Sequence, residues 1–236
     1  MKQDLNLLHN MIYTKNFSHV FQPLIDLQTW EVNGFEALFR SKLVDSPEQL
    51  FSLAMKNNML YELDTHSIYH ALLTASKRKS IHRLFINIYP STMMHPFFEP
   101  FLNKLYLNGL IMNTKVIVEI SEAEEIKDLL GMKSVIELMR ELGIGIAIDD
   151  YGKGETTLQT IIDIEPDIVK LDKTFSSRLA LSLDKQSEVR KLANICQNEK
   201  MKLVLEGMEN HSELVIAKML GIDLGQGYLI GRPKEM

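Results

Sequence analysis

The chain has 236 residues, of which 45% are apolar and 24% charged, and its formal net charge is -5 at pH 7. A chain of this length and composition can bury the core of a globular protein. Its acidic balance and lack of a basic stripe argue against binding of polymeric nucleic acid. No apolar stretch reaches the length of a membrane span, and the amino terminus has no signal-peptide core. The single cysteine, Cys196, excludes an internal disulfide, so we expect a cytoplasmic protein without a membrane segment.

The first part of the chain predicts a β-hairpin. Residues 1–17 form a helical lead-in, and strands are expected over residues 20–27 and 31–39. Only a few residues around Gln28-Thr29-Trp30 join these strands, which is too short for a parallel crossover. The first two strands are therefore predicted to be antiparallel.

Helical and strand-like stretches alternate through the rest of the chain. Ser46-Pro47-Glu48-Gln49 has the hydroxyl cap and first-turn proline of a helix start, and helices are also expected over residues 63–76, 134–142 and 189–196. The intervening strands (83–88, then VIVEI, IGIAI, DIVKL and KLVL) are continuously apolar. This pattern is typical of parallel strands that helices cover on both faces. No linker divides the chain, so one domain spanning residues 1–236 is expected.

Seven apolar runs end in a polar residue, and such residues are costly to bury unless they are paired or bound to a ligand. An open doubly wound sheet gathers ligands at two or three strand ends, whereas every parallel strand of a barrel ends at the same mouth. Because the seven polar residues are spread along the whole chain, they favour an α/β fold of the TIM-like (β/α)8 barrel type, with the first strand antiparallel to the rest. The seven residues are Glu36, Asn87, Glu119, Asp149, Lys170, Glu206 and Gln226.

The residue types at these positions indicate hard divalent cations. Glu36, Asn87, Glu119 and Asp149 offer only oxygen ligands, which suit Mg²⁺ or Mn²⁺ and not zinc. Asp150 adds a carboxylate, which we expect to act from the start of the following loop because neighbouring strand residues point opposite ways. Two cations bridged by Asp149 would neutralise a phosphodiester and supply hydroxide near neutral pH.

Two further residues have more than one reading. Lys170 either holds the attacking water or stabilises charge on phosphoryl oxygens, and Glu206 either binds the second cation or accepts the proton of the water. Taken singly, each carboxylate is more often a solvated strand end than a ligand, and only their coincidence favours a site. His66 and His70 have the spacing of a zinc helix but lack its glutamate, so an ordinary helix face is preferred. Gly152-Lys153-Gly154 resembles the hinge of a mobile loop more than a phosphate cradle.

The motifs in their order resemble those of the EAL-domain phosphodiesterases, which hydrolyse cyclic di-GMP in bacterial second-messenger signalling. The resemblance extends almost from end to end, and the family's barrel, with its antiparallel first strand, agrees with the hairpin inference. The loop after Asp150 departs from the family, because Lys153 and Glu155 replace residues that are usually neutral. The matching segments are FQPL (21–24), EAL (36–38), EISE (119–122), DDYG (149–152), KLD (170–172), EGME (206–209) and QGYLIGRP (226–233).

The resemblance implies a role for each matching residue. Glu36, Asn87, Glu119 and Asp149 would bind one Mg²⁺ or Mn²⁺, and Asp149 and Asp150 a second. Lys170 and Glu206 would act around the nucleophile. Near the substrate the resemblance places Gln22 and Arg40, the latter suited to phosphate, with Gln226 at the metal-bound water or the substrate. Glu122 would steady the loop after Asp150, and Glu209 is a loop-organising or a surface carboxylate.

Two functions remain open at this level. The first is a metal-dependent phosphodiesterase that converts cyclic di-GMP to linear pGpG. The second is an inactive or weakly active EAL module that senses cyclic di-GMP or contacts a protein partner. The complete set of ligands, Lys170 and Glu206 favours the enzyme. A homodimer is compatible with either function.

Overall fold

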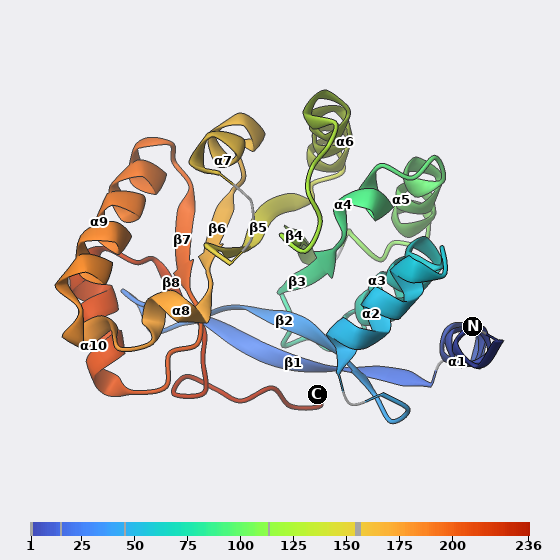
Figure 1. Ribbon diagram of the computed structural model, residues 1–236, viewed down its shortest axis with the longest axis horizontal. Helices are drawn as coiled ribbons and strands as arrows, with labels where there is room; N and C mark the ends of the chain where they lie inside the picture. The colour runs from blue at the N-terminus through green and yellow to red at the C-terminus, as the bar shows by residue number, and fades with distance from the viewer. Residues whose placement is uncertain (1, 15, 45, 113, 154–156) are drawn as a thin grey trace.

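Eight strands form a closed barrel in the computed structural model, which describes residues 2–14, 16–44, 46–112, 114–153 and 157–236 (Figure 1). Neighbours in the chain are neighbours in the sheet, and β8 closes the barrel against β1. The strands are β1 Phe17–Asp26, β2 Val32–Ser41, β3 Arg83–Ile88, β4 Lys115–Ile120, β5 Gly145–Tyr151, β6 Ile168–Leu171, β7 Lys202–Leu205 and β8 Leu224–Gly225.

The orientation of the strands confirms the predicted barrel. Strand β1 is antiparallel to both β2 and β8, and every other neighbouring pair is parallel. The β1–β2 turn closes through a hydrogen bond from Trp30 N to Asp26 O, with Trp30 in the left-handed region at φ 64°. Strand β2 pairs with β1 along its whole length but with β3 only from Phe35 to Ala37. Its outer half therefore leaves the barrel beside β1.

The four predicted helical stretches are present, with boundaries shifted at some ends. Ser46 caps its helix as expected, since its side chain accepts from Gln49 N. The helix expected at residue 134 begins at Leu129, because Asp128 caps it by accepting from Gly131 N. The helices are α1 Lys2–Thr14, α2 Pro47–Lys56, α3 Leu60–Ala75, α4 Pro90–Met93, α5 Phe98–Leu107, α6 Leu129–Glu141, α7 Leu158–Ile164, α8 Lys173–Ser176, the 3-10 turn η1 Leu179–Leu181, α9 Leu183–Asn198 and α10 His211–Leu220.

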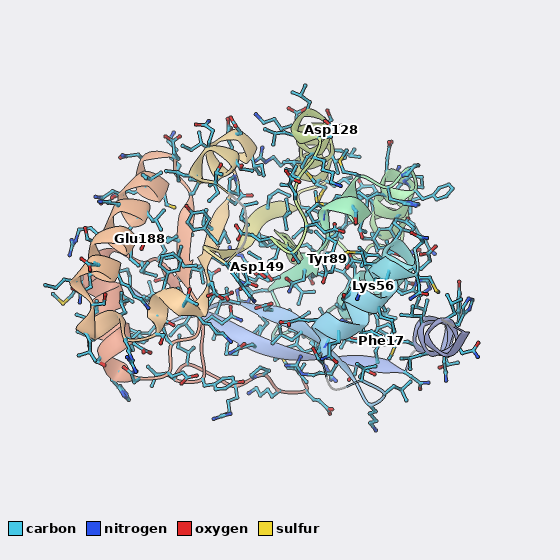
Figure 2. All side chains as sticks on the ribbon, in the orientation of Figure 1. Phe17, Lys56, Tyr89, Asp128, Asp149 and Glu188 are labelled. Carbon is cyan, nitrogen blue, oxygen red and sulfur yellow. The ribbon has the colours of Figure 1, made fainter. Side chains whose placement is uncertain are left out.

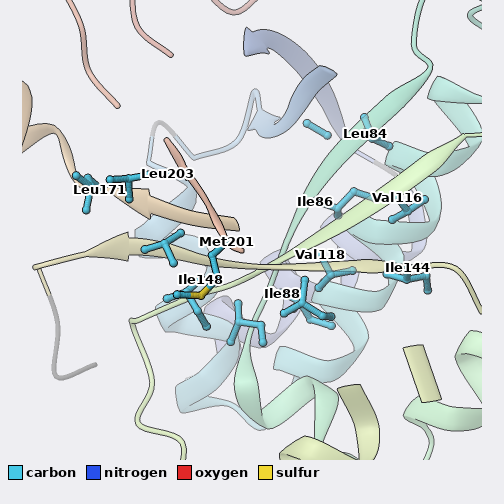
Figure 3. Packing of buried hydrophobic residues seen from close by; sticks show 14 of the residues in the cluster. Leu84, Ile86, Ile88, Val116, Val118, Ile144, Ile148, Leu171, Met201 and Leu203 are labelled. Atoms are coloured by element: carbon cyan, nitrogen blue, oxygen red, sulfur yellow. The ribbon is translucent and has the colours of Figure 1, made fainter. Parts of the chain in front are cut away.

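Side chains alternate between two apolar layers along the strands. Outward-facing residues of β3 to β7 pack against the helices, as Figure 3 shows for Ile86, Val118 and Leu203. Inward-facing residues form a small plug inside the barrel. A Cβ on Gly34 would lie 2.8 Å from Phe85, so this glycine leaves room for the ring. The plug comprises Leu24, Phe85, Ile117, Ala147, Ile168, Val204 and Leu224.

A separate apolar cluster lies outside the barrel. Leu8, Met11 and Ile12 of α1 pack with α2, α3 and the outer ends of β1 and β2. Figure 1 shows α1 beside α3, where β1 and β2 extend away from the barrel. None of the helices in the described ranges has the length and apolar character needed to cross a bilayer.

Candidate metal and phosphodiester site

Polar residues form the layer directly above the plug, at the carboxyl ends of the parallel strands. On six strands the polar residue follows the plug residue by two positions, as Asn87 follows Phe85 and Lys170 follows Ile168. Since side chains two apart share a face, each polar group enters the barrel mouth. Glu36 differs from the prediction because it lies in the middle of β2, whose outer half continues past the rim.

Lys170 lies at the centre of this layer and is fully buried. Its Nζ is 2.7 Å from Glu119 Oε1, 2.8 Å from Asp149 Oδ1, 2.7 Å from Glu206 Oε1 and 3.4 Å from Glu36 Oε2. Four strands thus aim carboxylates at one ammonium group. Glu36, Glu119 and Asp149, three of the four residues expected to bind one cation, therefore all contact the Nζ atom of Lys170.

Glu36 connects the remaining residues to this cluster. Its Oε1 accepts a hydrogen bond from Asn87 Nδ2 at 2.9 Å, and its Oε2 accepts from Gln226 Nε2 at 2.6 Å. Gln22 lies opposite Glu36 in the β1–β2 register, and its Oε1 accepts from Gln226 Nε2 at 3.3 Å. Asn87 is thus linked to Glu36, and Glu36, Glu119 and Asp149 are linked through the ammonium group of Lys170.

The buried charges shift the pKa of each member of the cluster. Burial would lower the pKa of Lys170, but four surrounding carboxylates raise it well above its usual value. Burial raises the pKa of Glu119 well above its ordinary range, and the charge of Glu36 adds to this. Burial, with the charges of Asp149 and Glu36, raises the pKa of Glu206 to about 8. For Glu36, burial is outweighed by Lys170 and by the amides of Gln226 and Asn87, which hold its pKa below the usual value.

Asp150 reaches the cluster through a backbone irregularity. The prediction that it acts from the following loop is wrong, because β5 continues to Tyr151. The β5–β6 register shifts between Ile148 and Tyr151, and Asp150 has φ 56°. Such a bulge re-aims a side chain, so neighbouring carboxylates can face the same site. One oxygen each from Asp149, Asp150 and Glu206 lie within 4.8 Å of one another.

An open cavity of about 350 Å³ lies over this cluster. Among the residues that line it, Gln22, Glu209 and Gln226 were expected near the substrate or its loops. Leu38, Lys173 and Tyr228 also line it and were missed by the sequence reasoning. The sequence could have indicated two of them. Leu38 is two positions after Glu36 and so shares its face of the strand, and Lys173 directly follows the KLD motif. A second hollow of about 320 Å³, between α9 and α10 near Met201 and Asp223, lies at the opposite ends of the strands.

Two expected residues lie farther from the cluster. Arg40 is exposed, donates to Phe39 O at 2.7 Å and is not among the residues lining the cavity. It shares a face of β2 with Glu36 but lies about 13 Å farther along, at about 3.3 Å per residue. Glu122 lies two residues beyond the end of β4. Burial, and then the charge of Glu122, raise the pKa of Tyr151 in β5. Of the loop after Asp150, residues 154–156 lie outside the described part of the chain, so the hinge prediction for Gly154 is not addressed.

The cluster has the chemistry of a hard-cation site. Four carboxylates, those of Glu36, Glu119, Asp149 and Glu206, surround one buried ammonium group, and Asp150 lies beside Asp149 and Glu206. Within the described residues, the Oε2 atom of Glu119 has no hydrogen-bond partner although the side chain is fully buried. A group of oxygen ligands with a net negative charge suits divalent cations such as Mg²⁺ or Mn²⁺. Figure 2 shows Asp149 in the middle of the molecule, among the strands of the barrel.

The fold and the cluster define a class of protein, namely TIM-type barrels with a cluster of acidic residues at the carboxyl ends of their strands. The chain belongs to the EAL domain family, whose sequence profile matches residues 6–233.

Known proteins are similar to this chain along most of its length. A Pseudomonas aeruginosa protein named cyclic di-GMP phosphodiesterase PA2567 is 31% identical over 226 residues, covering 93% of this chain and 38% of the relative. The Klebsiella pneumoniae protein BlrP1, solved as a calcium/cy-diGMP complex, has a TM-score of 0.82 and 28% identity over 93% of this chain and 56% of that one. The Escherichia coli blue light- and temperature-regulated antirepressor BluF is 26% identical over 94% of this chain and 55% of the relative. The chain thus spans well under two thirds of these proteins.

Proposed function

We propose that this chain is a divalent-metal-dependent phosphodiesterase that hydrolyses cyclic di-GMP to linear pGpG. The observation that carries the proposal is the ring of four carboxylate residues around the buried ammonium group of Lys170. Relatives named cyclic di-GMP phosphodiesterases support the substrate. We further propose that residues 1–236 act as one domain, with residues 1–17 as its lead-in, and that it works in the cytoplasm, which the single free cysteine fits.

Glu36, Asn87, Glu119 and Asp149 would hold one cation, and Asp149 with Asp150 a second. Bound Mg²⁺ or Mn²⁺ neutralises phosphodiester charge and lowers the pKa of water. The chain's own residues then have separate tasks. Lys170 keeps the carboxylates together and offers positive charge to a phosphoryl oxygen. Gln226 orients Glu36 by donating to it, and Gln22 accepts from the same Gln226 amide.

Glu206 is suited to accept the proton of the attacking water. It is partly exposed to the cavity, and burial raises the pKa of its carboxyl to about 8, within the range useful to a general base near neutral pH. The water oxygen forms a bond to phosphorus as the bond from phosphorus to the 3′ oxygen breaks. The freed 3′ oxygen takes up a proton, and the ring opens to a chain with a 5′ phosphate.

A product assay tests this function. The purified chain is incubated with cyclic di-GMP and Mn²⁺ or Mg²⁺, and the nucleotides are separated by chromatography. We expect pGpG, and EDTA should stop its formation. Glu36→Gln and Lys170→Met should abolish turnover, whereas Glu137→Gln, at an exposed position of α6, serves as the matched control. Turnover retained in both site variants would refute the assigned roles.

Binding of cyclic di-GMP without turnover is the second candidate function. The observation that favours it is Lys153, whose Nζ lies 3.4 Å from Asp150 Oδ2 and places a positive charge beside a proposed ligand of the second cation. The likeness to a protein named an antirepressor points the same way. Binding of cyclic di-GMP measured by calorimetry, with no pGpG in the product assay at saturating Mn²⁺, would support this reading and contradict the enzyme.

A further inference from the structure

Two acidic side chains from other elements hold the turn between Asn87 and helix α4. Asp64, on α3, accepts a hydrogen bond from Tyr89 N through its Oδ2 at 3.0 Å. Glu124, in the segment after β4, accepts from Ser91 N at 2.9 Å and from the Ser91 hydroxyl at 2.9 Å. Tyr89, labelled in Figure 2, lies between the end of β3 and helices α2 and α3. The turn is therefore fixed from two sides.

The divergence of β2 from β3 explains why a carboxylate is needed there. The carbonyl of Ile88 accepts from Ser121 N on the β4 side, so the backbone N–H of Tyr89 faces the side of β2. Pairing between β2 and β3 stops at Ala37 and Ile86, so β2 does not pair with Tyr89. Asp64 is only 2% exposed and supplies the missing acceptor. A buried N–H without an acceptor would destabilise this end of β3.

The same turn sets the position of Asn87. Tyr89 is two residues beyond Asn87 in extended backbone, with φ -88° and ψ 141°, and its ring stacks on Phe51 of α2 with centroids 5.5 Å apart. Asn87 uses its Nδ2 to donate to Glu36 Oε1. Its amide oxygen is the atom suited to a cation. A shift of the Tyr89 backbone would move that oxygen and break the alignment with Glu36.

We propose that Asp64 and Glu124 are positioning residues for the cation site: they hold the turn from Tyr89 to Ser91 and thereby fix the amide of Asn87. The inference rests on the proposed function, because it assumes that Asn87 binds a cation. Neither carboxylate touches the cation site directly. Their effect passes through the backbone, in the way that partners of metal ligands tune affinity in other sites.

Mn²⁺ binding to the full chain without substrate provides the test, measured from the paramagnetic resonance signal of free Mn²⁺ during titration. Asp64→Ala should weaken Mn²⁺ binding about 10- to 100-fold. Asp64→Asn keeps an oxygen that can accept from Tyr89 N and should bind Mn²⁺ nearly as wild type does. Ser67→Ala is the matched control, since Ser67 is a buried polar residue of the same helix that contacts His19 instead. Urea unfolding of each variant separates stability from affinity.

The outcomes distinguish this inference from the proposed function. Unchanged Mn²⁺ affinity in Asp64→Ala, or an equal loss in Ser67→Ala, would overturn the positioning role while leaving the phosphodiesterase proposal standing. A wild-type chain that binds no Mn²⁺ would overturn both. If Asp64→Ala does not fold, Glu124→Ala decides the matter, because Glu124 is only half-buried. Weaker Mn²⁺ binding in Glu124→Ala supports the proposal that these carboxylates position the turn from Tyr89 to Ser91, and unchanged binding overturns it.

Discussion

Replacing Lys170 by methionine tests the balance of charge in the barrel mouth. Methionine has a similar length, so the substitution removes the ammonium group and leaves little empty space. Four carboxylate residues, of which Glu119 is fully buried, then lose their common partner. Removing one partner of a buried ion pair costs about 3–5 kcal/mol of unfolding free energy. We expect a loss in this range for metal-free Lys170→Met at pH 8.

The pH dependence of this loss follows from the carboxyl groups. Against its burial, the ammonium group of Lys170 and the amides of Gln226 and Asn87 hold the pKa of Glu36 below its usual value of 4.5 in wild type. Without the ammonium group, burial should raise the pKa of Glu36 above that value. A carboxyl whose pKa is higher in the folded state favours folding when protonated, and this contribution is lost as pH rises from the unfolded towards the folded pKa. The loss in Lys170→Met should therefore be smaller at pH 5.5 than at pH 8.

Urea unfolding followed by far-ultraviolet circular dichroism measures both quantities. Lys191→Met, at an exposed position of α9, is the control and should change stability little. Saturating Mn²⁺ should recover part of the loss, because a ligand at 100 times its dissociation constant stabilises by about 2.7 kcal/mol. A loss below about 1 kcal/mol at pH 8, or one that does not vary with pH, would refute the charge balance described here.

Three further predictions concern other parts of the site. Burial raises the pKa of Asp64 from 3.8 to about 7, so wild type should lose stability relative to Asp64→Asn between about pH 4 and pH 7, by up to about 4 kcal/mol in urea titrations. The same change of stability with pH in both proteins would contradict this. Gly227→Ala should destabilise by about 1–3 kcal/mol, since a Cβ there would lie 2.2 Å from Met208 O, and an unchanged melting temperature would argue against that packing. Lys153→Thr should bind Mn²⁺ more tightly than wild type in calorimetry, because the ammonium group near Asp150 is removed; weaker binding would assign Lys153 a supporting role.

Much of the fold was predictable because its signals are local. Continuous apolar runs identified β3 to β7, and the short link around Trp30 required β1 and β2 to be antiparallel. The helix cap at Ser46 was likewise predictable from the residues that directly follow it. Boundaries were less predictable where a cap preceded the apolar stripe, as Asp128 does for α6.

The sequence alone determined which residues are available for the site, since Glu36, Asn87, Glu119, Asp149, Lys170 and Glu206 stand at corresponding places on successive strands. Only the tertiary structure decided how they meet. Lys170 reaches Glu36 across 134 positions because the barrel closes, and Asp150 turns to the same site through an irregularity in the β5–β6 pairing. Asp64 meets Tyr89 because β2 leaves β3 at that point. Such contacts depend on strand register and closure, which a pattern of neighbouring residues does not encode.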